Sequence, residues 1–521
     1  MSEEKNNPMN ATQDDEGRNI SVWHGLNDVP DFPPLTENIS VDVCVIGAGI
    51  AGMSVAYQLT REGKSVAVIE DGAIGSGETG RTTAHLSFAL DSRYYELIRI
   101  HGEEKARLAY ESHRAAVEEI EDIVKREKID CDFVRLDGYL FTPTDKDDEE
   151  LQIEKDATHS IGFKSTLLVH DSPAKSLKSG PCLLFPRLGQ FHPLKYISGL
   201  AQAITKKGGK IYCKTHASEI NGGTSATVKT EGGAVISCRH IVVATNSPVN
   251  DMVVIHTKQH PYRTYVIATR IERGSVPLAL YWDTPDPYHY IRIESPKEKD
   301  YDLLIIGGED HKTGQEENPD DRFTCLEEWS RERFPMIESI EYRWSGQVME
   351  AVDGLAFIGK NPMDEDNVYI ATGDSGHGMT HGTIAGMLLK DLILKRKNPW
   401  VELYDPSRMV PIAVAGEYVK ENANMAAQYA DWITPGEEES TEAIPAGEGA
   451  IIRRGLLKIA VYKDESGKVH ERSAVCPHLG CIVSWNSTEK SWDCPCHGSR
   501  FDCYGTVVNG PSNSDLQEVE K

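Results

Sequence analysis

The sequence predicts an α/β domain built on a parallel sheet, followed by a small all-β domain at the C-terminus. Residues 41–70 contain an apolar run, a Gly-rich turn, a helical segment and a second apolar run, which is the pattern of a βαβ unit. The segments LLKIAVY and KVHERSAV near the C-terminus predict short antiparallel strands. With 521 residues the chain exceeds the roughly 250–300 at which one core stops growing, so we expect several domains.

Composition and charge limit the classes of protein to consider. The net charge of −26 argues against nucleic-acid binding and against a basic membrane-docking face, since both need clustered Lys and Arg. The chain contains no transmembrane run of about 18 apolar residues, and its polar N-terminus has no signal-peptide core. We therefore expect a cytoplasmic protein whose residues 1–35 form a disordered segment.

The first βαβ unit carries a dinucleotide motif. Gly47, Gly49 and Gly52 form GxGxxG, with Ala48 inside the turn, and Glu70 ends the second strand. The glycines allow a tight turn and close approach of a pyrophosphate, which the helix N-terminus attracts. Glu70 is placed to bind the ribose hydroxyls.

A second Gly/Thr cluster, GSGETGRTTAHLS, follows this unit. Further motifs come in order: GQFHPLKYISGLAQAITKKGGKIYCKTHASEI, HIVVATNS, RWSGQVMEAVDGLAFIGK and NVYIATGDSGHGMTHGTIAGMLLKDLI. Together they resemble the FAD-dependent amine and amino-acid oxidases, the family of D-amino-acid oxidase, glycine oxidase and sarcosine oxidase. The resemblance implies that residues 36–410 form a Rossmann-like, glutathione-reductase-type FAD domain interleaved with an antiparallel β substrate domain.

The same resemblance assigns flavin contacts by position. Thr82 aligns with a His that anchors the flavin covalently in some relatives, so noncovalent FAD is expected. The residues implied to line the flavin or adenine are Gly80, Arg81, Thr82, Ala217, Gly373, Gly376, His377, Gly378 and Met379. His381 is expected on the helix surface.

Substrate residues are also implied by position. Arg292 corresponds to an Arg that grips the substrate carboxylate in glycine oxidase, a task that suits a guanidinium fork, or else it is a surface-strand Arg. His85 could polarise the flavin ring or satisfy a backbone carbonyl. Tyr262, Tyr265 and Trp344 are either pocket walls or core residues.

Four residues near the C-terminus form a metal-ligand set. Cys476 with His478 and Cys494 with His497 give CxH and CxxH loops, the ligands of a Rieske [2Fe–2S] centre, which carries single electrons. A structural zinc site is the alternative for two Cys and two His. Its usual forms, CxxC followed by HxxxH or by a second CxxC, do not match these loops.

The loops CPHLGC and CPCHGS resemble the quinol-oxidising Rieske proteins of cytochrome bc complexes. The resemblance implies a disulfide between Cys481 and Cys496, and it implies that Ser499 bonds a bridging sulfide beneath a loop at Gly510 and Pro511. Leu479 would shield the cluster. Phe501 replaces a Tyr that bonds a ligand sulfur, so we expect a potential below the top of the range of roughly −150 to +300 mV.

The composition of residues 411–443 predicts a helix followed by an acidic linker, and residues 444–521 are expected to form the Rieske domain. The linker composition predicts that the Rieske domain moves between flavin and acceptor.

These features predict a redox enzyme that oxidises a small amine or amino acid at a flavin and passes single electrons to the cluster and an unknown external partner. Two alternatives stay open. Electrons could flow from the cluster to the flavin and substrate, or the protein could be a non-enzymatic redox sensor or electron-transfer adaptor. No His₂-carboxylate pattern stands out, which counts against a Rieske oxygenase.

Overall fold

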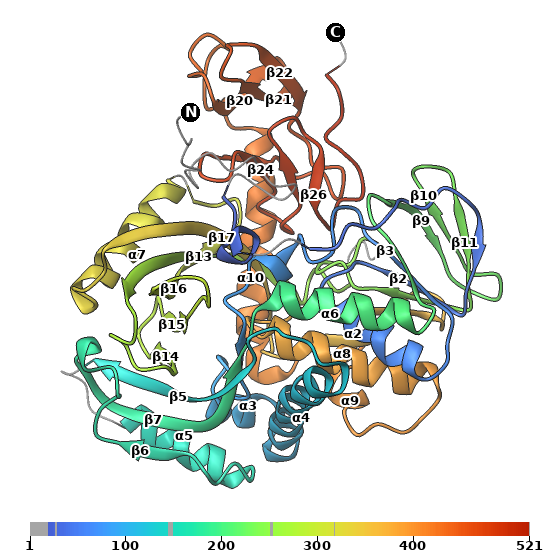
Figure 1. Ribbon diagram of the computed structural model, residues 1–521. Coiled ribbons are helices and arrows are strands. Elements are labelled where there is room, and N and C mark those ends of the chain that lie inside the picture. Colours follow the sequence, from blue (N-terminus) through green and yellow to red (C-terminus); the bar gives the residue numbers. More distant parts are fainter. Residues whose placement is uncertain (1–18, 27–28, 144–148, 251–253, 317, 520–521) are drawn as a thin grey trace, which may run out of the picture.

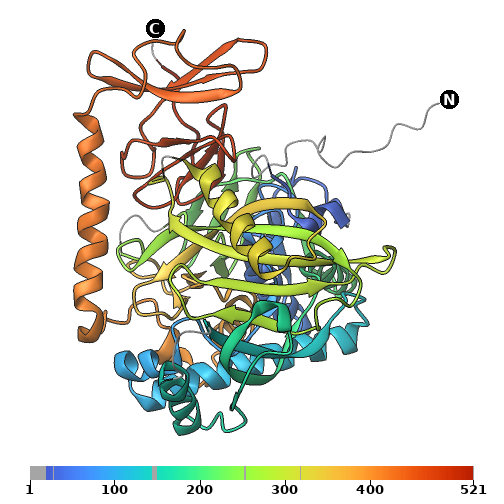
Figure 2. The same ribbon diagram turned by 90° about the vertical axis from the view of Figure 1, so that its left-hand side faces the viewer.

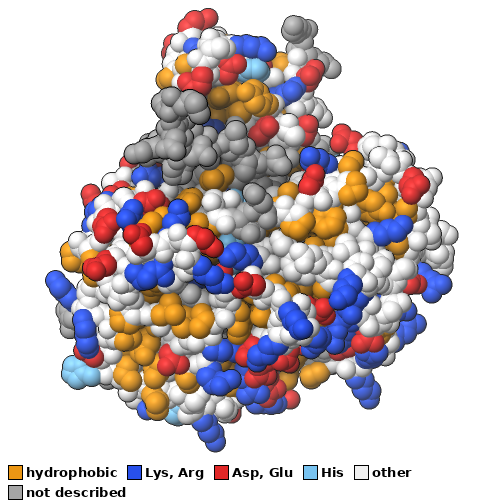
Figure 3. All heavy atoms as spheres, viewed as in Figure 1, with side chains coloured by type: hydrophobic (Ala, Val, Ile, Leu, Met, Phe, Trp, Pro, Cys, Tyr) orange, Lys and Arg blue, Asp and Glu red, His pale blue; other side chains and the backbone are white. Residues whose placement is uncertain are grey.

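The computed structural model describes residues 19–26, 29–143, 149–250, 254–316 and 318–519. Figure 1 shows a wide body formed by the flavin-type part of the chain, with the C-terminal domain seated on top of it. None of the helices in these ranges is both long and apolar enough to cross a membrane. On the face shown in Figure 3, acidic and basic side chains are interspersed.

A six-stranded sheet lies at the centre of the dinucleotide-type domain. All its neighbouring pairs are parallel except the last one at one edge, where β18 runs against β19. From edge to edge the strands are β18 (Phe357–Lys360), β19 (Val368–Thr372), β12 (His240–Val243), β2 (Val43–Ile46), β3 (Val66–Ile69) and β8 (Lys210–Tyr212). The apolar runs of β2 and β3 are fully buried, as a doubly covered parallel sheet requires.

Helices α2 (Ile50–Arg61), α6 (Pro193–Lys206) and α8 (Gly378–Ile393) lie together beside this sheet, near the long helix α4 (Glu103–Glu127) (Figure 1). The helices α2 and α8 approach closely at Gly386, where a Cβ would lie 2.8 Å from the Cβ of Ser54. A small second sheet, β1 (Ile39–Ser40), β11 (Val235–Ser237), β10 (Thr227–Thr230) and β9 (Ala217–Asn221), flanks them.

The substrate-type domain is a large, mainly antiparallel sheet, as the family resemblance implies. Only β14 and β5 pair in parallel among its described strands. Its order is β17 (Ser339–Ala351), β13 (Gln259–Glu272), β16 (Tyr301–Lys312), β15 (His289–Glu294), β14 (Leu280–Asp283), β5 (Val134–Pro143), β7 (Ser179–Gln190) and β4 (His85–Leu86), with β6 (Leu167–Val169) on β7. Outer helices near it are α3 (Tyr94–His101), α5 (Glu149–Ser160) and α7 (Pro319–Arg333), whereas α9 (Val401–Tyr404) contacts β18 of the six-stranded sheet.

Two small antiparallel sheets form the C-terminal domain, which confirms the expected all-β unit. They are β20 (Glu448–Arg454), β21 (Leu457–Lys463) and β22 (Val469–Ser473), and β23 (Ser484–Asn486), β24 (Ser491–Asp493), β25 (Arg500–Asp502) and β26 (Val507–Asn509). Helix α10 (Ala415–Ala427) runs along the side of the molecule toward this domain (Figure 2). The expected helix in 411–443 is therefore present.

The expectation of disorder over 1–35 is wrong for its second half. Helix α1 (Val22–Leu26) buries Val22 and Trp23 completely, and Trp23 donates from Nε1 to the carbonyl of Thr82 at 2.6 Å. Residues 1–18 lie outside the described ranges. The polar composition of residues 1–35 as a whole gave no indication of the short helix that buries Val22 and Trp23.

The expectation of a mobile C-terminal domain is also not supported, because its contact with the flavin-type body is packed like an interior. Glu489, in the turn between β23 and β24, has a fully buried side chain that ion-pairs with Arg81 and Arg263 of the other domain, each at 3.6 Å. Burial alone would raise the pKa of Glu489, but Arg81, Arg263 and Arg500 hold it below its usual range. Such a desolvated network favours one docked position.

Candidate functional site

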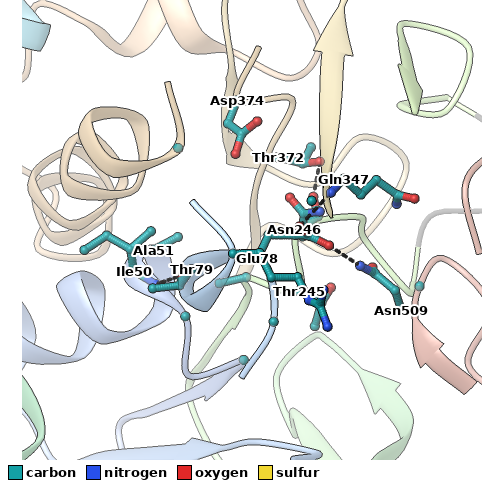
Figure 4. A pocket seen from close by; sticks show the side chains of 18 of the residues that line it. Ile50, Ala51, Glu78, Thr79, Thr245, Asn246, Gln347, Thr372, Asp374 and Asn509 are labelled. Carbon is teal, nitrogen blue, oxygen red and sulfur yellow. Dashed lines mark hydrogen bonds between the residues drawn. The ribbon is translucent and has the colours of Figure 1, made fainter. Parts of the chain in front are cut away.

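One cavity of about 1150 Å³ passes between the two parts of the body and reaches the C-terminal domain. At one end it is lined by Glu70 and Ala217, and at the other by His377, Met379 and Tyr290. Figure 4 shows side chains from several elements around it, including Thr79, Asn246 and Asp374. Ligand sites commonly measure about 300–1,000 Å³, so this cavity can hold a dinucleotide and leave further space.

The first end of the cavity fits a pyrophosphate. Gly47 has φ +102°, and a Cβ on Gly52 would lie 1.9 Å from the carbonyl oxygen of Gly47, so both positions require glycine. Helix α2 starts after Gly49 without a side-chain cap, and the hydroxyl of Thr79 accepts from the N–H of Ile50 at 2.9 Å. Thr79 occupies one N–H of the first turn, but the helix N-terminus still faces the cavity, where its dipole can attract an anion.

Glu70 lies at the same end of the cavity. Its Oε2 accepts from the N–H of Ala48 at 2.6 Å and its Oε1 from the N–H of Gly72 at 3.1 Å. Burial, as the largest influence, raises the pKa of this carboxyl. The carboxyl is therefore fixed beside the glycine turn, where ribose hydroxyls of a dinucleotide would lie.

The structure separates the predicted flavin contacts into lining and supporting residues. Those that line the cavity are Gly47, Gly49, Glu70, Arg81, Thr82, Ala217, Gly376, His377, Gly378 and Met379. Those outside the lining are Ala48, Gly52, Gly80 and Gly373. Gly80 faces α1, because a Cβ there would lie 2.5 Å from Cε1 of His24. Flavin contact by each residue stays a prediction, as does noncovalent attachment.

Arg292 does not fit its expected role as a carboxylate clamp. It is fully buried behind the cavity, where Nη1 donates to the carbonyls of Thr83 at 2.9 Å, Ala84 at 3.2 Å and Phe191 at 3.1 Å. Its Nη2 pairs with Glu294. The position of Arg292 in the family motif indicated a carboxylate clamp, but its hydrogen bonds to three carbonyls and its pairing with Glu294 give it a structural role.

His85 lines the cavity as a neutral side chain. Burial, with the charge of Arg292, lowers the pKa of His85 to about 3. Its Nε2 contacts the carbonyl oxygen of Ile291 at 3.3 Å and its Nδ1 contacts the Thr83 hydroxyl at 3.0 Å. These contacts favour the simpler of the two interpretations, in which the ring satisfies a backbone carbonyl.

His381 differs from expectation, and of the two interpretations of Tyr262, Tyr265 and Trp344 the structure does not support the pocket wall. His381 is buried rather than on the helix surface, with Nδ1 2.9 Å from the carbonyl oxygen of Asp374. Tyr262, Tyr265 and Trp344 are not among the residues that line the cavity. Tyr265 and Trp344 are core residues, and Trp344 donates to the carbonyl of Arg81 at 2.7 Å.

The C-terminal loops bring the four predicted cluster ligands together. Cys476, His478, Cys494 and His497 are all buried, and the rings of His478 and His497 lie 4.9 Å apart. The thiol contact between Cys476 and Cys494 lowers the pKa of Cys476 and raises that of Cys494. Burial, followed by His478 and His256, lowers the pKa of His497 to about 2, which keeps a neutral imidazole suited to bind iron.

The disulfide that the Rieske resemblance implies is present, whereas the contact of Ser499 with a bridging sulfide stays a prediction. Cys481 and Cys496 are joined by a disulfide, and their Sγ atoms lie within 4.8 Å of that of Cys494. The N–H of Ser512, in the loop after Pro511, donates to the hydroxyl of Ser499 at 2.9 Å. The residues present therefore fit a [2Fe–2S] group.

The cluster site faces the flavin-type body. The ring of His256, which the sequence did not single out, lies 4.9 Å from that of His478 and 5.6 Å from that of His497. Gln347, in the cavity wall, donates from Nε2 to the carbonyl of Gly498 at 3.0 Å, next to His497. His256 belongs to no motif and Gln347 lies within RWSGQVMEAVDGLAFIGK, yet the sequence singled out neither of them, because their role at the interface comes only from domain docking.

Glu78 and Asn509 mark a second bridge across the interface, visible in Figure 4. The amide of Asn509 donates to Oε1 of Glu78 at 3.0 Å, while Oε2 of Glu78 accepts from the N–H of Gln347 at 2.7 Å. The cavity wall and the Rieske-type domain are thus joined by consecutive hydrogen bonds.

This fold, with a dinucleotide cradle and a Cys₂His₂ cluster site facing the same body, defines an oxidoreductase that carries a flavin and an iron–sulfur centre. Comparison with known families agrees: a model described as "FAD dependent oxidoreductase" matches residues 42–392 and one described as "Rieske [2Fe-2S] domain" matches 437–520. The chain belongs to this FAD-dependent oxidoreductase family and has a C-terminal Rieske domain. Its cofactors are FAD and a [2Fe–2S] cluster.

Several relatives share all or part of this arrangement. The chain is 34% identical to a putative Rieske 2Fe-2S iron-sulfur protein, YhfW, of Bacillus subtilis, over 96% of this chain and 97% of that protein. It is 30% identical to the γ-glutamylputrescine oxidoreductase of Escherichia coli, over 70% of this chain and 87% of that one. Glycine oxidase from Geobacillus kaustophilus shares the fold, with TM-score 0.60 and 18% identity over 72% of this chain and 100% of that one.

Proposed function

We propose that the protein oxidises an amine at the FAD and delivers the electrons singly, through the Rieske cluster, to an external acceptor. The observation that carries this proposal is the Gln347 bridge, which connects the cavity wall to Gly498, the neighbour of cluster ligand His497. A wall shared by both sites favours transfer within one chain. The name of the E. coli relative, γ-glutamylputrescine oxidoreductase, supports an amine as substrate.

Residues of this chain have defined tasks in such a reaction. FAD supplies hydride acceptance, and the cluster supplies one-electron transfer. Gly376 and Gly378 expose the N-terminus of α8 to the cavity, where the helix dipole favours negative charge on a reduced ring. Neutral His85 forms part of the wall, and the docked C-terminal domain covers part of the cavity and limits the access of water.

Anaerobic mixing with a panel of amines and amino acids tests the proposal. We expect a substrate to bleach the flavin and the cluster to show its reduced EPR signal during the same turnover. Bleaching while the cluster stays oxidised would refute the circuit, and no bleaching by any compound would favour the adaptor alternative. A cluster potential below that of the flavin would favour the reverse direction.

The variant Cys476→Ser separates the two sites. It should still be bleached by substrate but should give no cluster signal and should lose turnover with a one-electron acceptor. Cys325→Ser is the matched control, because Cys325 is exposed on α7 and distant in sequence from the ligand loops. If Cys476→Ser turned over at the wild-type rate, electrons would leave the flavin by another route.

A further inference from the structure

The cluster site reaches the molecular surface through its first ligand loop. Residues 491–500, which contain the second ligand loop, are all buried. In the first loop the two ligands are buried, whereas Pro477, Leu479 and Gly480 are partly exposed. Because the imidazole ligands face His256 of the flavin-type body, the first loop is the part of the described cluster site that an external partner can approach.

Two aromatic side chains connect this loop to solvent. They follow α10, which runs along the outside of the molecule (Figure 2). The hydroxyl of Tyr429 donates to the carbonyl of Leu479 at 2.8 Å, and Nε1 of Trp432 donates to the carbonyl of Gly480 at 2.9 Å. Yet Tyr429 and Trp432 keep exposed fractions of 38% and 37%. Tyr and Trp side chains that are held at the polar end and exposed over the ring are typical of protein interfaces.

The exposed surface continues from these rings onto the C-terminal domain. Arg453 donates from Nη1 to the carbonyl of Ile433 at 3.1 Å and from Nε to that of Gly455 at 3.0 Å. These bonds hold Ile433 beside the turn between β20 and β21, where Leu456 and Leu457 are exposed. Adjoining exposed apolar side chains mark interaction sites, although single ones are common. We define the outer patch as Tyr429, Trp432, Ile433, Leu456 and Leu457.

The border of the outer patch is acidic. Residues 411–443 contain seven Asp or Glu and one Lys, and Asp431 and Glu438 are close to the patch in the chain. The basic side chains beside the patch are engaged, because Arg453 donates to three carbonyls and Arg454 pairs with Glu471. The net charge of the chain, −26, has the same sign as this border. A positively charged protein would therefore be steered toward the patch.

We propose that the outer patch docks a basic one-electron carrier protein, which receives the electron from the cluster through the first ligand loop. This inference rests on the proposed delivery of electrons to an external acceptor and names the class of that acceptor. One electron leaves the reduced cluster and reduces the redox centre of the carrier, and no bond forms or breaks. An apolar centre with a charged border fits the small interfaces of transient redox complexes.

Two carriers of opposite charge test the electrostatic part. The full-length protein is reduced with dithionite, the excess is removed, and rapid mixing measures the reduction of a basic cytochrome c or of an acidic plastocyanin. At an ionic strength of about 0.01 M we expect a second-order rate constant at least about ten-fold higher for cytochrome c. Most of that advantage should be lost at about 1 M, where the Debye length has fallen from about 30 to about 3 Å.

The variant Trp432→Ala tests the apolar part. It should lower the rate constant with cytochrome c at least about ten-fold, because a Trp at the centre of an interface carries much of the binding energy. The EPR spectrum of the reduced cluster should stay as in wild type, since Trp432 holds a carbonyl and no ligand atom. Leu278→Ala is the matched control, because Leu278 is 48% exposed on the loop before β14 of the flavin-type body.

The variant Ile433→Arg tests docking without electron transfer. Ile433 is 81% exposed, so the change places a positive charge on the patch without disturbing the fold. Isothermal titration with zinc-substituted cytochrome c, which exchanges no electron in the dark, should give a Kd at least about ten-fold weaker than that of wild type. Met363→Arg makes the same kind of change at a 94% exposed position between β18 and β19 and should keep the wild-type Kd.

The outcomes distinguish this inference from the proposed function, because dithionite supplies the electrons and no amine is needed. Equal rates with the two carriers, a rate insensitive to salt, or no reaction with either carrier would overturn the docking proposal. So would an unchanged rate in Trp432→Ala or an unchanged Kd in Ile433→Arg. Each of these results would leave amine oxidation standing, which only the absence of flavin bleaching by amines would refute.

Discussion

At the residue scale, docking of the C-terminal domain depends on a few buried charges. Glu489 meets Arg81 and Arg263 with all three side chains almost inaccessible to water. Removing one member of a buried ion pair leaves the remaining charge without compensation. The free-energy cost of that unpaired charge exceeds the stabilisation that the intact pair provides. The interface is therefore sensitive to single substitutions at these positions.

Glu489→Gln should lower the free energy of unfolding by about 3–5 kcal/mol and loosen the interface. The depressed pKa of Glu489 means that its contribution is complete above about pH 4.5 and is lost as pH falls below that value. Thermal unfolding followed by flavin fluorescence measures the change. The exposed pair of Arg472 with Glu518 gives the control, Glu518→Gln, which should match wild type.

Glu350, on β17, predicts the opposite dependence of stability on pH. Burial and the charges of Asp91, Asp310 and Asp374 raise the pKa of Glu350 to about 8, so the folded state holds its proton more tightly than the unfolded chain. Stability from this group is present below about pH 4.5 and decreases as pH rises toward 8.

Glu350→Gln should therefore melt at a higher temperature than wild type at about pH 9 and at the same temperature at about pH 4.5. We expect a gain of at least about 1 kcal/mol at the higher pH, since one pKa unit corresponds to about 1.4 kcal/mol. Melting curves at both pH values measure it, with the exposed Glu219→Gln as control. A gain that is equal at both values would contradict the assignment.

At the element scale, the two motif-bearing segments were predictable and the contacts between elements were not. The βαβ unit of β2, α2 and β3 and the cluster loops follow from short-range patterns of glycine, apolar residues, Cys and His. Arg292 shows the limit: its place on β15 was foreseeable, but its partners Thr83, Ala84 and Phe191 come from other elements. Which side chain reaches a cavity depends on the pairing of strands that are far apart in the sequence, and short-range patterns do not contain that information.

Gly52→Ala tests the turn between β2 and α2. A Cβ there would overlap the carbonyl oxygen of Gly47, so the turn must open and the phosphate cradle is lost. We expect purified protein with far less FAD per chain, measured by absorbance, and an intact cluster spectrum. Gly416→Ala in α10 is the control, because nothing lies within 4 Å of its Cβ, and it should keep its FAD.

At the scale of the whole molecule, the domain order and cofactors were evident from sequence, whereas the docking was not. An acidic linker indicated mobility, yet α10 and its continuation contact the cluster loop, where Tyr429 donates to the carbonyl of Leu479 at 2.8 Å and Trp432 to that of Gly480 at 2.9 Å. Composition describes how a segment behaves in solvent and carries no information about a partner surface.

A docked domain predicts that cluster reduction is a process within one chain that needs no large movement. The rate at which the cluster follows flavin reduction should be independent of protein concentration and unchanged when sucrose doubles the viscosity. Rapid-mixing spectroscopy measures it. A rate that falls in proportion to viscosity would indicate a swinging domain instead.

The carbonyl of Ala217 accepts from the side chain of Asn513, and residues 502–515 contribute to the cavity lining, so the C-terminal domain forms a lid over the adenine side. Passage of a dinucleotide on this side of the cavity would require that lid to move. We therefore expect a fixed order of assembly, in which the FAD domain binds its cofactor before the Rieske domain docks onto it. Exchange of the prosthetic group with free nucleotide should be slow in the mature protein and quick in a chain truncated before the lid.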